Sequence, residues 1–254
     1  MYSVIISEKD IAGMNIFSQI KKLTKEPNFE IIKISHETLY SDEIDKMAGG
    51  DFLIFATRHS SEKEKPCFCV HTPGNWSHAE FGGKTRELCI SPATLQREFY
   101  LELKNQNTTS FPIMLEATHH GPFLPNKPCL FIEIGSSPKE WINEEAGSVV
   151  ARTLYEVCGK KLKEKKALIG IGGPHYCDNF SKLLEKTELA IGHICPKHML
   201  DGFTADLALM AKERTYEKDP LFALDWKGLG KNKERVQKIL EKEGISYKKI
   251  KDLV

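Results

Sequence analysis

Nine histidines are the side chains of this sequence best suited to acid–base chemistry or metal binding near neutral pH. Four segments that contain them follow or end apolar runs typical of buried strands; these segments hold His59, His119-His120, His175 and His193. In open α/β sheets, ligands bind at the carboxyl edge of the strands. The sequence therefore predicts that these histidines meet in one functional site at such an edge.

The segment His119-His120-Gly121-Pro122 is the most suggestive of the four. Gly-Pro favours a turn, which lets one imidazole act as metal ligand or base while its neighbour packs. Glu116 precedes His119 by three residues and is a candidate ligand or orienting carboxylate. For any single histidine, the alternative is an ordinary structural imidazole.

Two further segments carry candidate substrate contacts. Gly172-Gly173 lacks the spacing of a dinucleotide or phosphate loop, so these glycines are interpreted as allowing close approach of a substrate to the backbone. Lys197 lies between His193 and His198 and is suited to a phosphate or carboxylate. Trp76 is a candidate for gripping a base or ring, with a packed loop as the alternative.

Other kinds of chemistry are less well supported. A serine hydrolase is disfavoured because the sequence has no G-x-S-x-G, although Ser60 and Ser61 beside His59 remain candidate nucleophiles. The seven cysteines are scattered without a CxxC pair, so we expect mostly free thiols in a reducing compartment.

The elements that must position these residues alternate between strands and helices, which indicates a largely parallel sheet in an α/β layer fold. Strands are expected at 2–7, 29–34, 51–57, 111–118, 129–134, 166–171, 189–194, 222–226 and 245–250. Helices are expected at 10–25, 91–105, 204–214 and 231–243, and a long helix from the capping box at Ser137 to Cys158.

Length and composition favour one globular domain over residues 1–254, with a loop-rich insertion around 58–90. The net charge is +1, but residues 227–254 hold nine Lys and Arg against four Asp and Glu, and 160–166 form a second basic cluster. Such clusters attract phosphate backbones, the alternative being a solvated helix face. No run suits a membrane span or secretory signal, so we expect a cytoplasmic protein, and nothing indicates an obligate oligomer, so we expect a monomer.

Five motifs in this order, TRHSS, HTPGNW, ATHHGP, GIGGPHY and GHICPKHM, resemble the archaeal and plant D-aminoacyl-tRNA deacylase family over most of the chain. The resemblance implies a hydrolase that cleaves the ester between a D-amino acid and the 3′ end of tRNA. It also implies a three-layer α/β/α sandwich with a mixed, mostly parallel sheet, phosphorylase/hydrolase-like and similar to peptidyl-tRNA hydrolase. Two zinc ions per subunit and tRNA charged with a D-amino acid are the implied cofactor and partner.

We therefore expect an inner site of histidines, with Glu116 or Glu133 orienting one imidazole. Catalytic roles are expected for His119, His120, His175 and His59; metal binding for His120, His175, His193, His198 and Glu116; and substrate binding for Gly172, Gly173, Arg58, Trp76 and Lys197.

Two other functions share some of these features. The first is a zinc amidohydrolase or peptidase acting on small molecules, which needs no basic surface. The second is a non-catalytic RNA-binding module with structural zinc, which the scattered cysteines fit poorly because structural zinc sites are usually closed and cysteine-rich.

Overall fold

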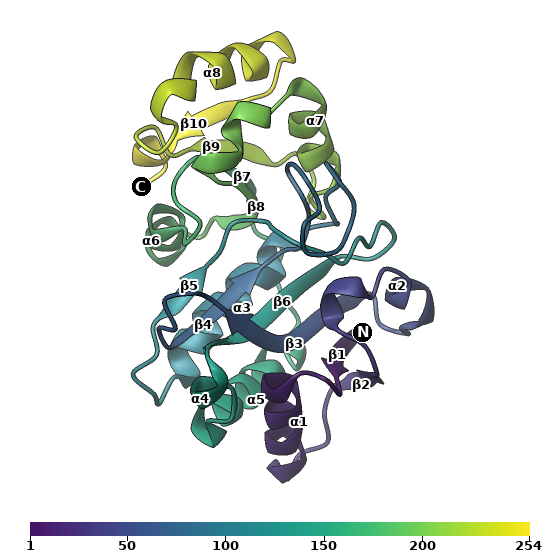
Figure 1. The fold of residues 1–254 in the computed structure, drawn as a ribbon. Helices are drawn as coiled ribbons and strands as arrows, with labels where there is room; N and C mark the ends of the chain where they lie inside the picture. Colours follow the sequence, from purple (N-terminus) through teal and green to yellow (C-terminus); the bar gives the residue numbers. More distant parts are fainter.

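The computed structural model describes all residues, 1–254, and the chain forms two β-sheets that lie one above the other in Figure 1. The first sheet has six strands in the order β2-β1-β3-β6-β4-β5, and only the β4–β6 pair is antiparallel. Its strands are β1 (Tyr2–Ser7), β2 (Phe29–Ile34), β3 (Phe52–Ser60), β4 (Cys67–His71), β5 (Ile113–Leu115) and β6 (Cys129–Ser136).

The second sheet has four parallel strands in the order β10-β9-β7-β8. These are β7 (Ala167–Ile171), β8 (Ala190–Cys195), β9 (Leu221–Leu224) and β10 (Tyr247–Lys249). The helices are α1 (Ile11–Lys22), α2 (Ile44–Met47), α3 (Ala93–Gln106), α4 (Pro138–Trp141), α5 (Glu144–Cys158), α6 (Asp178–Lys186), α7 (Ala205–Glu213) and α8 (Lys233–Lys242), with short 3₁₀ turns at Thr38–Tyr40, Lys197–Gly202, Gly230–Asn232 and Ile250–Asp252.

Side chains alternate between the two faces of the sheet along β3 and β6, so the main core lies on one face and the candidate site on the other. Ile54 and Ala56 of β3 belong to the main apolar cluster, which packs against α1, α3 and α5. Phe55 and Phe131 lie on the opposite face in a second apolar cluster. Further along the same face, towards the carboxyl ends of the two strands, the side chains become polar.

The second sheet is covered by helices on both faces. Ile169 and Phe222 belong to an apolar cluster with residues of α7 and α8, whereas Leu168 and Ile191 belong to one with residues of α6. The irregular segment 72–92 reaches from the first sheet to the second (Figure 1), where the Trp76 indole nitrogen donates to the backbone oxygen of Ile194 at 3.0 Å. None of the helices is both long and apolar enough to cross a membrane.

The α/β class with mixed, mostly parallel pairing is confirmed, but the strands divide between two sheets. Strand β4, which lies inside the segment expected to be loop-rich, was not predicted. It is only five residues long and lies between Pro66 and Pro73, so its turn-forming flanks hide it. The capping box at Ser137 is present, but it starts the four-residue α4; a second helix, α5, begins after Asn143, whose side chain caps it.

Candidate functional site

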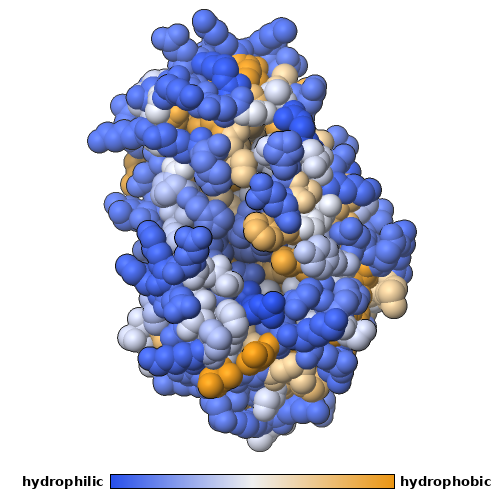
Figure 2. Space-filling model, in the orientation of Figure 1, coloured by the Kyte–Doolittle hydropathy of each residue, from blue (hydrophilic) through white to orange (hydrophobic).

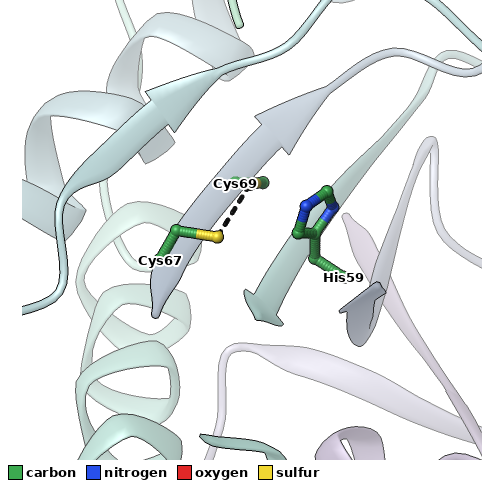
Figure 3. Close-up of side chains that lie close together, drawn as sticks. All are labelled: His59, Cys67 and Cys69. Atoms are coloured by element: carbon green, nitrogen blue, oxygen red, sulfur yellow. Dashed lines mark hydrogen bonds between the residues drawn. The ribbon is translucent and has the colours of Figure 1, made fainter. Parts of the chain in front are cut away.

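Three neighbouring strands of the first sheet build the polar part of its exposed face. His59 of β3 is paired with Gly135 of β6, and Gly135 is paired in turn with Cys67 of β4. Because side chains alternate along a strand, Cys67, Cys69 and His71 all lie on one face of β4. Figure 3 shows His59 and the two thiols lying close together on adjacent parts of the sheet.

The absence of a side chain at Gly135 makes this approach possible. A Cβ at this position would lie 2.7 Å from Cδ2 of His59 and 2.9 Å from Sγ of Cys67. The two thiols lie 3.6 Å apart. Hydrogen bonding to Cys69 lowers the pKa of Cys67, whereas burial raises the pKa of Cys69 well above its usual range.

Two buried carboxylates flank His59. Its Nδ1 lies 3.4 Å from Glu133 and 3.5 Å from Glu116, and its Nε2 lies 3.0 Å from the hydroxyl of Tyr176. Burial alone would lower the pKa of His59, but the two carboxylates outweigh it and raise the pKa to about 9. His59 is therefore an imidazolium at neutral pH, with both ring nitrogens acting as donors.

A second group of histidines surrounds Phe131 of β6. The ring of the fully buried His71 stacks on Phe131 at 5.2 Å and lies 4.2 Å from the ring of His119 and 4.8 Å from that of His120. Both ring nitrogens of His71 are buried without a hydrogen-bond partner. An uncompensated buried polar group is costly, so a ligand for His71 is expected here.

His119 and His120 are held in the tautomer that suits metal binding. Nδ1 of His119 donates to the backbone oxygen of Ala117 at 2.8 Å, and Nδ1 of His120 donates to that of Gly121 at 2.6 Å. The Nε2 lone pair of each ring is therefore available. Burial and nearby His71 lower the pKa of His119 well below its usual range and that of His120 to about 4, so both rings are neutral at pH 7.

The carboxylate of Glu116 links the two parts of the site. It accepts a hydrogen bond from Nε2 of His175 at 3.1 Å, and it is fully buried at its side chain. Burial would raise the pKa of Glu116, but His175 and His59 outweigh this effect and lower it. Nδ1 of His175 has no protein partner, and the ring is partly exposed. The pair can therefore present a basic nitrogen to a bound molecule.

His193 does not join this group, so its expected place in the inner site is wrong. Its Nδ1 lies 3.1 Å from the hydroxyl of Thr118, and its Nε2 donates to the backbone oxygens of Cys89 and Arg214 at 3.0 and 3.2 Å. It lies within β8 rather than beyond the strand's end, and its ring is completely buried. Both nitrogens are engaged, so it is a structural histidine.

We expect His193 to make the protein acid-sensitive. Burial lowers its pKa to about 4, whereas an unfolded histidine titrates near 6.5. Below pH 6.5 this histidine binds a proton in the unfolded chain but not in the folded chain. The free energy of unfolding therefore falls as the pH drops from 6.5 towards 4. Linkage gives about 2 kcal/mol for this residue between pH 7 and pH 5. Urea unfolding of the wild type and of His193→Gln should show a shallower pH dependence for the variant; parallel curves would contradict the assignment.

The remaining predicted residues lie around the histidines in different ways. Arg58 pairs with Glu37 at 3.1 Å. The ring of His198 lies 6.5 Å from that of His175, beyond direct shared coordination with it in this arrangement. Trp76 is buried in the second sheet's core, so it is primarily a packing residue.

The two predicted glycines form a tight turn after β7. Gly172 and Gly173 have positive φ values of 99° and 84°. A Cβ on either would lie 3.0 Å from an oxygen of Asp225. Their first role is therefore close packing of two backbone turns. Lys197 follows β8 beside this turn, with its backbone N–H donating to the Gly173 oxygen at 2.8 Å.

A cavity of about 510 Å³ opens over the carboxyl ends of β3 and β6, and we call it the histidine cavity. Its wall includes His59, His119, His120, His175 and Tyr176. The structure thus brings four of the predicted histidines, from three separate segments, to one wall, whereas His193 lies apart from them. The chemistry that this wall can perform is proton transfer, hydrogen bonding to an oxyanion and metal binding.

Four residues of the site were not on the expected set: His71, Cys67, Cys69 and Tyr176. The first three occupy alternate positions of Cys67-Phe-Cys-Val-His71, which is the pattern of one face of a strand. That spacing was a usable signal, but it has meaning only once β4 is recognised. Tyr176 directly follows His175 and carried no signal of its own.

The fold and the site together define an α/β enzyme with a hydrolytic type of centre, because a carboxylate–histidine pair, two neutral histidines and a tyrosine hydroxyl meet at one cavity. A sequence model described as D-aminoacyl-tRNA deacylase matches residues 47–248. The chain belongs to the D-aminoacyl-tRNA deacylase family.

Relatives that carry this name match nearly the whole chain. The D-aminoacyl-tRNA deacylase of Thermococcus onnurineus is 34% identical, covering 97% of this chain and 99% of the relative. That of Methanocaldococcus jannaschii is 32% identical, covering 98% and 99%. A crystal structure of a conserved protein of unknown function has a TM-score of 0.91 at 28% identity, covering 100% of this chain and 96% of that one.

Proposed function

We propose that this protein is a D-aminoacyl-tRNA deacylase, a hydrolase that cleaves the ester between a D-amino acid and the 3′ end of tRNA. Family membership supports the reaction. The observation that assigns the reaction to particular residues is the Glu116–His175 pair at the wall of the histidine cavity. The product tRNA returns to translation without the D-amino acid. Such a substrate places the enzyme in the cytoplasm, and since all these site residues come from one chain, a monomer suffices.

His175 is the proposed general base. Its Nε2–H donates to Glu116, which fixes the tautomer and stabilises the imidazolium that forms when Nδ1 accepts a proton. That proton comes from the water molecule whose oxygen attacks the ester carbonyl carbon, so proton removal and attack are one step. The same proton is delivered to the ribose oxygen as the ester bond breaks, so one base serves both steps.

Tyr176 is the proposed donor to the oxyanion. The imidazolium of His59 donates from Nε2 to the Tyr176 oxygen at 3.0 Å, which leaves the phenolic hydrogen free to point elsewhere. Burial is the main cause that raises the pKa of Tyr176 to about 12, so the phenol keeps its proton. A donor of this kind stabilises the charge that develops on the carbonyl oxygen.

The residues fit zinc best at His71, His119 and His120. Their ring nitrogens lie within 4.8 Å of one another, and the tautomers of two rings leave Nε2 free. His71 makes no hydrogen bond, and its nearest charged group is Glu133, 3.7 Å from Nε2. A zinc ion there would supply a Lewis acid close to the reacting ester. This set keeps His120 from the expected ligands and adds His71 and His119.

The other expected ligands fit zinc less well. Glu116 and His175 form a possible group with His119, but His119 has only one free nitrogen, which cannot serve two groups. Two further groups, His59–Cys67–Cys69 and His59–Cys69–Glu116–Glu133, use side chains that already contact Tyr176 and His175. We therefore propose one zinc position, at His71, His119 and His120, in place of the two ions that the resemblance implies.

The direct test is release of D-tyrosine from D-tyrosyl-tRNA by the purified protein, beside L-tyrosyl-tRNA, with and without a zinc chelator. We expect fast release of the D-amino acid only, lost on chelation and restored by zinc. D-selective release that survives chelation would retain the reaction and remove zinc from it. Release from neither ester would overturn the proposed function in favour of a small-molecule zinc hydrolase.

A further inference from the structure

Three neighbouring hollows of the surface share lining residues, so they lie one after another along the site, in a series that we call the path. The histidine cavity shares Phe81, His119, His120 and His175 with a smaller hollow of about 270 Å³, which we call the middle cavity. The middle cavity shares His198 with a groove of about 890 Å³, which we call the lysine groove. The proposed reacting groups thus lie between two compartments rather than at the end of one.

The lysine groove has no hydrophobic residue in its lining and carries free cations. It lies where β7, β8 and β9 end, so the turns after these strands form its wall. Lys197 and Lys227 are exposed and make no ion pair, whereas Lys231 is paired with Asp201. Asp225 is already satisfied by the backbone of Gly228 and the side chain of Asn179. The two free lysines are therefore available to phosphates.

The histidine cavity has the opposite electrostatic character. Its lining includes four carboxylates, those of Asp10, Glu37, Glu62 and Glu133, against two cations, Arg58 and the His59 imidazolium. Arg58 pairs with Glu37 and His59 faces Glu133, so negative charge still exceeds positive charge in this wall. Acidic walls repel phosphates and attract the ammonium group of an amino acid. The two ends of the path therefore favour opposite ends of one charged substrate.

The middle cavity is suited to a nucleoside. Its lining combines the exposed aromatic ring of Phe81 with His198 and Met199, whereas Trp76 borders it from the core. Phe81 is 62% exposed, which is unusual for a large apolar side chain and leaves its ring available for stacking. Figure 2 shows one face of the molecule as mostly hydrophilic, with small apolar patches near its centre.

The other basic cluster, at 160–166, lies at the opposite edge of the sheets. It precedes β7 and borders a hollow with Tyr2 and Phe52, which begin β1 and β3. The five residues of β7 span about 16 Å between this edge and the lysine groove. Lys160 and Lys165 are also neutralised by ion pairs with glutamates. This cluster is therefore not part of the path, although the sequence favoured it.

We propose that the single-stranded 3′ end of the tRNA enters along the lysine groove, with backbone phosphates at Lys197 and Lys227. The terminal nucleoside occupies the middle cavity beside Phe81, and the aminoacyl group extends into the acidic histidine cavity. The ester then lies at the wall of His119, His120 and His175 that the two cavities share. This direction of binding rests on the proposed function and adds the orientation of the substrate to it.

The test compares two substrates, D-tyrosyl-tRNA and D-tyrosyl-adenosine, which lacks phosphates. For the double variant Lys197→Glu/Lys227→Glu, we expect KM for the tRNA to rise at least tenfold with kcat little changed. The slope of log(kcat/KM) against log[salt] should become shallower by about 1.4, which corresponds to two single-strand phosphate contacts. Hydrolysis of D-tyrosyl-adenosine should be unchanged, whereas Phe81→Ala should raise KM for both substrates.

Lys163→Glu is the matched control, because Lys163 is exposed, makes no ion pair and lies in the 160–166 cluster. It should behave as the wild type on both substrates. Wild-type kinetics of the double variant on the tRNA, or an equal loss in Lys163→Glu, would overturn the path while leaving the function intact. A wild-type protein inactive on both esters would instead overturn the proposed function itself.

Discussion

Replacement of Glu116 by glutamine should lower kcat for release of D-tyrosine from D-tyrosyl-tRNA by a factor of about 10²–10⁴, with little change in KM. The buried carboxylate of Glu116 accepts the Nε2–H of His175, and an amide of similar shape carries no charge to stabilise the imidazolium. The amide can also turn its NH₂ group towards His175 and select the tautomer whose Nδ1 is already protonated. Initial rates at several tRNA concentrations separate kcat from KM.

Two further measurements distinguish the role of Glu116 as a positioning residue from a structural or ligand role. Glu156→Gln, an exposed substitution on α5, is the matched control and should leave the rate unchanged. The zinc content of Glu116→Gln should equal that of the wild type, since the favoured metal set does not contain Glu116. A variant that retains the wild-type kcat would remove the base mechanism, and one that loses zinc would make Glu116 a ligand.

The sequence predicted the convergence of histidines because each of the relevant strands is a strong local signal. DFLIFAT and CLFIEI are apolar almost throughout, and their boundaries in β3 and β6 differ little from expectation. His119 and His175 follow strands, and His59 lies within β3, which extends to Ser60 rather than ending at Thr57 as expected. The rule for carboxyl edges therefore placed all three at the correct end of the sheet. The direction in which each side chain points was then fixed by alternation.

Two features could not be obtained in this way, because they depend on which strands are neighbours. His193 follows the same local rule as the others, yet its position within β8 turns it towards Thr118 and away from the cavity. His71 lies in a strand that its proline neighbours conceal, and its role requires β4 to pair with β6 in an antiparallel direction. Pairing of strands distant in sequence is a property of tertiary packing, not of local pattern.

The position of β4 also explains how one site holds both a proton donor and neutral histidines. Along β6, Glu133 lies under His59 and Phe131 lies under His71. The carboxylate keeps His59 charged, whereas burial, with His71 nearby, lowers the pKa of His119 and His120 and keeps those rings neutral. Glu133 and Phe131 are two residues apart on β6. The environment beside Glu133 favours a cation, and the environment beside Phe131 favours a metal ligand.

Replacement of His71 by glutamine should weaken zinc binding at least about 100-fold and lower kcat/KM by about 10³ or more. His71 is the member of the His71–His119–His120 group that makes no hydrogen bond within the protein, and its loss leaves two ligands, which hold zinc poorly. Competition with a chromophoric chelator measures the affinity independently of activity, and thermal unfolding without zinc shows whether the variant still folds.

The control is His36→Ala, which replaces an exposed histidine outside the cavity. Unchanged zinc affinity in a folded His71→Gln variant would place the metal elsewhere, whereas a selective loss would make β4, the strand concealed in the sequence, an essential part of the centre.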